Sequence, residues 1–188
     1  MTGELRVEEI AAPDFVEPFE AWRVWRVVAG DGHYKLASAI KPTVWAPGEP
    51  LVATCLQSSP VRRWWQRFRG RDEHPPAPAF RCECGIYAAD LPQLRHYLND
   101  GLAPTAIGRV LGVVSLWGTV VECERGFRAS HAYPSRIYVP ADAWSRRGHR
   151  WDDLIGGLEI YDVPVEPLAA RCSEAVWALA HEQHPAMH

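Results

Sequence analysis

The feature that most constrains this fold is a long β-type run from Arg109 to Glu124, followed by a second run from Phe127 to Val139. Valine and leucine are frequent in the first run, as is typical of strands. Arg125-Gly126 supplies a turn between the two runs, and Gly112 and Gly118 mark positions where a strand bends or bulges. We therefore predict a long curved hairpin, which a twisted sheet or a coiled barrel accommodates.

Shorter runs upstream predict further strands. Phe19 to Val28 reads as a strand, and the turn at residues 29–32 leads into a partner strand from Tyr34 to Ile40. We place this second hairpin at a sheet edge because neither face of it is wholly apolar. Leu51 to Leu56 predicts a short buried strand with Cys55 at its end.

Helices are expected after these strands. Asp90 is a good helix N-cap with Gln93 three residues later. Trp151 to Leu158 predicts a short helix, and Ile160 to Val165 predicts a last strand or an extended segment. A closing amphipathic helix is predicted from an apolar stripe formed by Leu168, Cys172, Ala175, Val176 and Leu179.

Together these elements predict an α+β fold that is mainly β. We expect a single twisted sheet or a barrel, with short helices and a C-terminal amphipathic helix. Residues 1–18 are polar and interrupted by prolines, which predicts a flexible N-terminal arm. Residues 19–188 are expected to form one globular β-rich domain with a basic, aromatic insert at 61–71.

Composition narrows the classes of function. The chain has 188 residues, of which 47% are hydrophobic, which suffices for a core. Its net charge of -3 excludes a global attraction to nucleic acid, so such binding would need a local basic patch. No apolar run reaches about 18 residues and the N-terminus lacks the pattern of a secretory signal, so we expect a cytoplasmic protein without a transmembrane segment.

The cysteines predict a metal site. Cys82 and Cys84 lie one residue apart, and Gly85 permits the backbone turn that would bring their sulfurs together. Cys55 ends an earlier apolar run, and His74 precedes a proline-rich link to Cys82. Three thiolates and one imidazole suit zinc, and with all four positions filled by protein the ion would be structural.

A simpler interpretation of the same residues stays open. Cys55 could end a buried strand, His74 could be an exposed loop residue, and Cys82 and Cys84 could be a reduced surface pair. Cys123 is an alternative ligand, although its place in a long strand favours burial.

The insert at 61–71 combines cations with flat rings. This chemistry suits phosphate contacts with base stacking, and it also suits an anionic membrane surface. The alternative is a solvated loop or helix that lays its rings on the domain. The candidate binding residues are Arg62, Arg63, Trp64 and Trp65.

The long hairpin offers a second candidate binding set, Trp117, Glu122, Arg128 and Tyr133. An aromatic platform, a carboxylate and a guanidinium could line a ligand pocket. The alternative is ordinary packing, in which Trp117 covers Gly118 and Glu122 pairs with Arg128 across the strands. We find no phosphate-binding glycine loop, nucleophile elbow or metalloprotease helix, so no catalytic residue is assigned and the sequence favours a role other than catalysis.

Several motifs resemble an uncharacterised group of actinobacterial proteins over roughly residues 19–165. They are His74-x-x-x-Pro78, Cys82-x-Cys84-Gly85-Ile86-Tyr87-Ala88, Leu116-Trp117-Gly118-x-Val120-x-Glu122, Gly126-Phe127-Arg128-Ala129 and Ala132-Tyr133-Pro134. This resemblance implies one domain and supplies no activity.

A weaker likeness is to PUA-like barrels of the ASCH and EVE type. The residues that carry it are Gly85 to Ala88, Asp90 to Asn99 and Val110 to Leu116. The resemblance implies a PUA-like barrel, and such barrels usually bind nucleic-acid bases, although a fold alone does not transfer a function.

The leading functional hypothesis is a zinc-stabilised, β-barrel-like module that recognises a nucleic-acid base or a peptide through an aromatic-rich face. One alternative is an assembly factor that docks on a protein partner through the insert at 61–71. Another is a small ASCH-like hydrolase, which would need an ionisable pair, and Glu122 with Arg128 are the nearest candidates.

Overall fold

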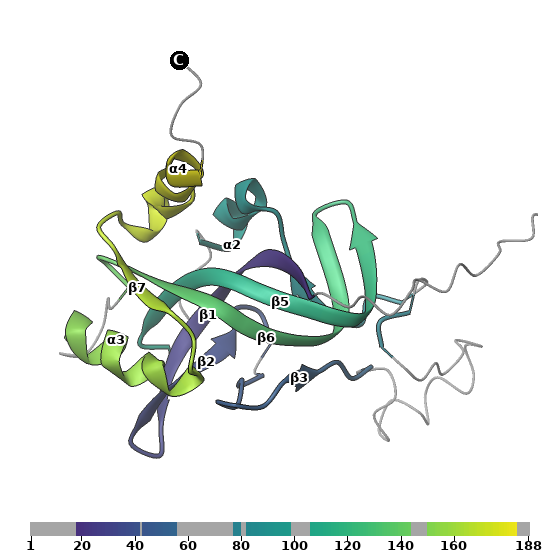
Figure 1. The fold of residues 1–188 in the computed structure, drawn as a ribbon, viewed down its shortest axis with the longest axis horizontal. Coiled ribbons are helices and arrows are strands. Elements are labelled where there is room, and N and C mark those ends of the chain that lie inside the picture. Colours follow the sequence, from purple (N-terminus) through teal and green to yellow (C-terminus); the bar gives the residue numbers. More distant parts are fainter. Residues whose placement is uncertain are drawn as a thin grey trace, which may run out of the picture.

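The computed structural model describes residues 18–41, 43–55, 77–79, 82–98, 106–143 and 150–183. Within them the fold is mainly β, with one mixed, twisted sheet that is not closed into a barrel (Figure 1). The strands are β1 (Phe19–Gly30), β2 (His33–Ser38), β3 (Leu51–Val52), β4 (Ile86–Ala88), β5 (Gly108–Cys123), β6 (Gly126–Pro140) and β7 (Val165–Leu168). This confirms the mainly β class, and of the two expected arrangements the protein adopts the single sheet.

The sheet is built on the β5–β6 hairpin. Its strands run in the order β2-β1-β5-β6-β3, and β4 and β7 also pair with β6. The register of β5 on β6 shifts between Val113 and Val114 and again between Trp117 and Val120, close to the two glycines. A Cβ atom on Gly112 would lie 2.0 Å from the carbonyl oxygen of Arg136, so only glycine allows the strands to approach there. The predicted curved hairpin is therefore confirmed.

Both faces of the sheet are covered, because β1 and β5 send alternate side chains into two separate cores. Trp25 and Val110 belong to a core packed against α3 (Trp151–Leu158) and the 3-10 turn η3 (Glu159–Tyr161). Their neighbours Val24 and Leu111 belong to the opposite core. That core is covered by the turn η2 (Leu91–Leu94), α2 (Arg95–Leu98) and α4 (Cys172–Gln183), which lie above the sheet in Figure 1.

Tyr161 ties η3 to the sheet. Its fully buried hydroxyl accepts a hydrogen bond of 2.7 Å from the backbone N–H of Leu36 and donates one of 2.8 Å to the carbonyl of Trp45. Burial raises the pKa of this phenol to about 12, so it stays neutral and keeps both bonds.

Four local predictions need correction. The strand expected at 51–56 is only β3, and Val52 is exposed, because the chain pairs with β6 at two residues alone. Asp90 occupies the N-cap position but makes no side-chain capping bond. The last strand is β7 rather than 160–165, since η3 takes the first part of that segment. Leu168 consequently lies in β7, and the closing helix starts at Cys172.

The predicted arm at 1–18, apart from its last residue, and the insert at 61–71 fall outside the described residues. Of the helices that the structure describes, none combines the length and the apolar character needed to cross a bilayer.

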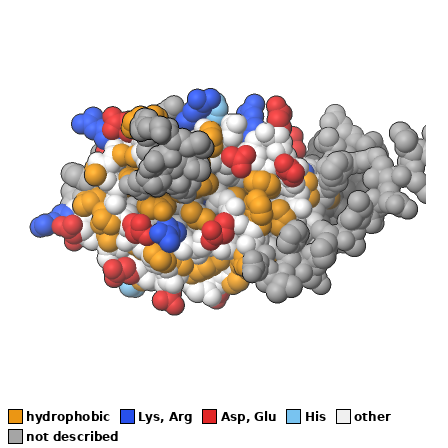
Figure 2. Space-filling model, turned by 45° about the horizontal axis from the view of Figure 1, so that its top comes forward, with side chains coloured by type: hydrophobic (Ala, Val, Ile, Leu, Met, Phe, Trp, Pro, Cys, Tyr) orange, Lys and Arg blue, Asp and Glu red, His pale blue; other side chains and the backbone are white. Residues whose placement is uncertain are grey.

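The surface in Figure 2 carries apolar side chains between charged groups of both signs. Isolated apolar residues are normal on protein surfaces. Because acidic groups interrupt the basic ones, the described part of this face gives a nucleic-acid backbone no continuous basic track.

Candidate metal centre

Three thiols meet at one end of the sheet. Cys55 follows β3, and Cys82 and Cys84 lie in the loop that leads into β4. The three Sγ atoms all lie within 4.8 Å of one another, with Cys84 buried and the other two half-buried. Segments that are 27 residues apart in the chain therefore converge on one group of sulfurs.

The spacing of these sulfurs suits a tetrahedral ion. Cys55 Sγ and Cys82 Sγ are 3.8 Å apart. Zinc–sulfur bonds of about 2.3 Å at tetrahedral angles place two sulfurs about 3.8 Å from each other. Thiolate sulfur is a donor that zinc accepts readily, so the group fits a metal ion in both geometry and chemistry.

The loop backbone explains why the two nearby cysteines point the same way. The N–H of Cys82 donates a hydrogen bond of 3.1 Å to the carbonyl of Ala79. Gly85 then adopts φ of +123°, where a Cβ atom would lie 3.0 Å from Cβ of Pro78 and 3.1 Å from Cβ of Arg128. Only glycine fits this position, as the sequence predicts.

Arg128 of β6 braces the same loop. Its guanidinium donates to the carbonyl of Cys82 and, at 3.0 Å, to the carbonyl of Cys84, while its Nε donates to Cys123 Sγ at 3.1 Å. Burial alone would lower the pKa of Arg128, but the hydrogen bond to Cys123 and the nearby Tyr87 and Cys84 raise it above the usual value. The guanidinium is thus a fixed positive charge beside the thiols.

The pKa of the Cys84 thiol is raised. Burial is the main cause; a backbone hydrogen bond from Ala79 opposes it, and the neighbouring Cys82 and Cys55 reinforce it. Thiols that crowd one another resist ionisation unless a cation is present. The group therefore favours either protonated thiols or a bound metal ion.

The structure does not bring the predicted hairpin pocket together. Glu122 pairs with Phe127, and Arg128 pairs with Val121, so the carboxylate and the guanidinium leave opposite faces of the hairpin. Glu122 is exposed, whereas Arg128 is buried against the cysteine loop.

The two aromatic members of that set have structural contacts. Trp117 stacks on His131 with a centroid distance of 5.9 Å. The Tyr133 hydroxyl accepts a hydrogen bond of 2.6 Å from the N–H of Gly48 and donates one of 3.0 Å to the carbonyl of Tyr161. Neither ring lines the cavity described below.

The remaining predicted site residues lie outside the described part of the chain. They are His74, proposed as the fourth metal ligand, and Arg62, Arg63, Trp64 and Trp65 of the insert. Their roles stay predictions from the sequence. The alternative ligand Cys123 is engaged with Arg128 instead of the three-thiol group.

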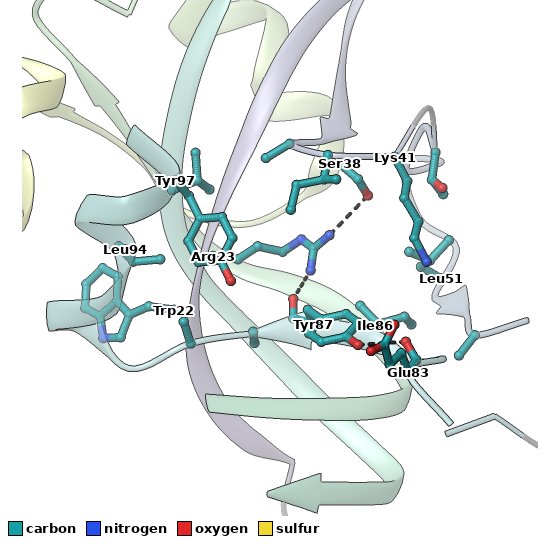
Figure 3. Close-up of a pocket in the computed structure, with 18 of the residues that line it drawn as sticks. Trp22, Arg23, Ser38, Lys41, Leu51, Glu83, Ile86, Tyr87, Leu94 and Tyr97 are labelled. Carbon is teal, nitrogen blue, oxygen red and sulfur yellow. Dashed lines mark hydrogen bonds between the residues drawn. The ribbon is translucent and has the colours of Figure 1, made fainter. Parts of the chain in front are cut away.

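Sequence reasoning missed a cavity of about 370 Å³ beside the cysteine loop. Thr54, Glu83 and Gly85 line it, and each of them is the direct neighbour of a cysteine of the group. Arg23 of β1 points into the lined space (Figure 3). The available signal was that Arg23 is the one charged residue on the strand face that it shares with Ala21, Trp25 and Val27.

No protein-family model matches this chain, and neither the curated proteins nor the solved structures contain a significant match to it.

Proposed function

We propose that this protein is a zinc-stabilised binding module in which the ion fixes the wall of a ligand cavity. The observation that carries the proposal is the convergence of Cys55, Cys82 and Cys84 within 4.8 Å. The residues interleaved with these cysteines line the cavity, so an ion held by the three thiols would set the shape of that wall.

The ion in this proposal has a structural role. Three thiolates and one further protein ligand would fill a tetrahedral shell and leave no open position for a substrate. The sequence nominates His74 as the further ligand. Arg128 would partly offset the net negative charge of such a centre from its place against the loop carbonyls.

Elemental analysis of purified full-length protein tests the proposal. We expect about one zinc per chain, a large loss of zinc in Cys82→Ser, and no loss in Cys172→Ser, since Cys172 lies at the start of α4 outside the group. His74→Ala tests the fourth position through the same measurement. A zinc-free protein whose Cys82→Ser variant is equally stable would contradict the proposal.

A binding role fits the cavity better than the hydrolase alternative does. That alternative requires Glu122 and Arg128 to act together, and the hairpin register separates them. The docking alternative depends on residues 61–71, and partner capture by a protein lacking this segment tests it.

For the leading hypothesis, that the protein recognises a nucleic-acid base or a peptide, the proposed binding site is this cavity. Its wall contains the ring of Tyr87 and, on the other side of Arg23, the ring of Tyr97 (Figure 3). Aromatic side chains with a few fixed polar groups are typical of small-ligand sites.

A further inference from the structure

Arg23 places a guanidinium inside the cavity without an anionic partner among the described residues. It donates to the carbonyl of Tyr87 and, at 3.1 Å, to the hydroxyl of Ser38. Its Cζ atom lies 5.0 Å from the ring centroid of the buried Trp45. All of these partners are neutral, and the Nε–H group is buried with no hydrogen-bond acceptor.

The one acidic side chain among the lining residues does not neutralise this charge. Glu83 forms no ion pair with Arg23, and Figure 3 shows it beside the Tyr87 hydroxyl rather than at the guanidinium. Burial lowers the pKa of Arg23 to about 10, which still leaves it charged at neutral pH. A sheltered charge without a counter-ion is unfavourable in the folded protein and is typical of a site that binds an anion.

A second cation faces the same space. Lys41, in the segment after β2, lines the cavity, and Figure 3 shows its amine above Leu51 on the side toward which the guanidinium of Arg23 points. Arg26 holds this segment in place by donating to the carbonyls of Ser38, at 2.9 Å, and of Lys41, at 3.2 Å. The two positive groups therefore border one region of the cavity, Arg23 from β1 and Lys41 from the segment after β2.

Apolar groups also border that region. Leu51, Ile86 and the ring of Tyr87 border it, and Ile86 belongs to the main core. A volume of about 370 Å³ is in the range of small-molecule sites and far too small for a folded partner.

We propose that this cavity binds a small organic anion, whose carboxylate or phosphate group is held by Arg23 and Lys41 and whose apolar or aromatic body packs on Leu51, Ile86 and Tyr87. Arginine offers two N–H groups in a fork that matches an oxyanion, and lysine adds a point charge. The inference rests on the proposed function only in that the cysteine loop supplies one wall.

Matched probes test this on zinc-loaded full-length protein by calorimetry and NMR titration. Phenyl phosphate and AMP represent phosphates, phenylacetate represents carboxylates, and phenylacetamide is a neutral analogue of phenylacetate. We expect at least one anion to bind with a Kd at or below about 1 mM, and at least tenfold more tightly than phenylacetamide. Whichever class of probe, phosphate or carboxylate, binds with the lower Kd identifies the preferred anionic group.

Two variants and two controls locate the binding. Arg23→Gln should weaken the best anion at least tenfold and Lys41→Met several-fold; Lys41 is exposed, so its variant keeps the fold. Arg136→Gln and Lys35→Met make the same charge changes in ion pairs away from the cavity and should leave the Kd within twofold. The inference is overturned if no anion binds better than phenylacetamide, or if both cavity variants bind as the parent does.

Zinc content measured on the same samples separates the two proposals. Protein that holds zinc and binds no anion contradicts this inference and leaves the metal centre intact. Protein whose Cys82→Ser variant loses zinc and still binds the anion with unchanged Kd supports the inference and contradicts the role of zinc in shaping the wall.

Discussion

Nε of Arg128 donates a 3.1 Å hydrogen bond to Sγ of Cys123 across the end of the β5–β6 hairpin. The same guanidinium binds the carbonyls of Cys82 and Cys84 with its NH1 group. One side chain thus joins the hairpin to the loop that presents two of the three thiols, and the geometry of the thiol group depends on a residue that is not part of it.

We therefore predict that Arg128→Met reduces both metal affinity and stability. The substitution leaves the carbonyls of Cys82 and Cys84 without their donor, and the bond to Cys84 is buried. It should therefore lower the free energy of unfolding by about 2–4 kcal/mol. Zinc affinity should fall at least tenfold, since ligands that lose their support bind metals 10–100-fold more weakly. Competition with a chromophoric chelator measures the affinity.

Arg136→Met is the matched control for this change. Arg136 lies on the same strand but forms an exposed ion pair with Glu166 at 2.7 Å. Such pairs contribute about 0–1 kcal/mol, so this variant should keep its zinc. Equal losses in both variants would refute the bracing role of Arg128.

The raised pKa of Cys84 sets the pH dependence. In the metal-free protein the buried, protonated thiol is favoured, so its contribution to stability is present below the ordinary cysteine pKa and is lost as pH rises through the raised value. Zinc requires the thiolate and displaces this proton. Zinc affinity should therefore rise with pH, by about tenfold per pH unit for each proton displaced.

Zinc titrations between about pH 6.5 and pH 8.5 follow this effect. Cys172→Ser should leave the slope unchanged, because Cys172 lies outside the thiol group, although burial raises its pKa to about 12. An affinity that does not change with pH would show that the thiols are not the ligands.

Tyr161→Phe should destabilise the fold by about 1–3 kcal/mol, because it leaves the buried N–H of Leu36 and the carbonyl of Trp45 without their partner. Tyr87→Phe is the comparison, since its hydroxyl donates only to the exposed carbonyl of Glu83. Urea unfolding should show a clearly smaller loss for Tyr87→Phe. The opposite order would mean that the Tyr161 hydroxyl does not anchor η3.

Two adjacent glycines of α3 should respond to alanine with opposite signs. A Cβ atom on Gly156 meets nothing within 4 Å, so Gly156→Ala should stabilise the protein by about 0.5–1 kcal/mol through helix propensity. A Cβ atom on Gly157 would lie 2.2 Å from Cδ2 of Tyr34, so Gly157→Ala should destabilise it by about 1–3 kcal/mol. Thermal unfolding of the two variants decides this.

The sequence predicted best those elements whose pattern is long and lies within one continuous segment. The β5–β6 hairpin and α3 were predicted because an extended apolar run or a complete helical pattern carries its own evidence. The strand predicted at 51–56 was too long, because the length of a strand depends on its partner and β6 pairs with only two residues of this segment.

The site shows the same limit. Cys82 and Cys84 could be grouped from their spacing, and Cys55 from its place at the end of an apolar run. Which face of the hairpin each side chain occupies depends on the length of the turn, which the sequence left open. A three-residue turn would have set Glu122 opposite Arg128, whereas the observed two-residue turn at 124–125 shifts the register by one and separates them.

The cavity could not be predicted from the sequence because the residues that line it lie far apart in the chain. Arg23 meets Ser38 and Tyr87, which lie 15 and 64 residues further along the chain. In the sequence Arg23 is one polar position of an alternating strand. It becomes a sheltered cation only where the fold brings Ser38 and the carbonyl of Tyr87 in β4 to its guanidinium.

The double coverage of the sheet has a consequence for how the chain tolerates change. All residues from Gly108 to Leu111 are buried, whereas burial alternates from Gly112 to Trp117. A saturation library of β5 should therefore show a block of uniformly intolerant codons followed by a stretch in which tolerated and rejected substitutions alternate. The boundary between these two patterns would mark, without any coordinates, where the second layer of helices stops shielding the strand.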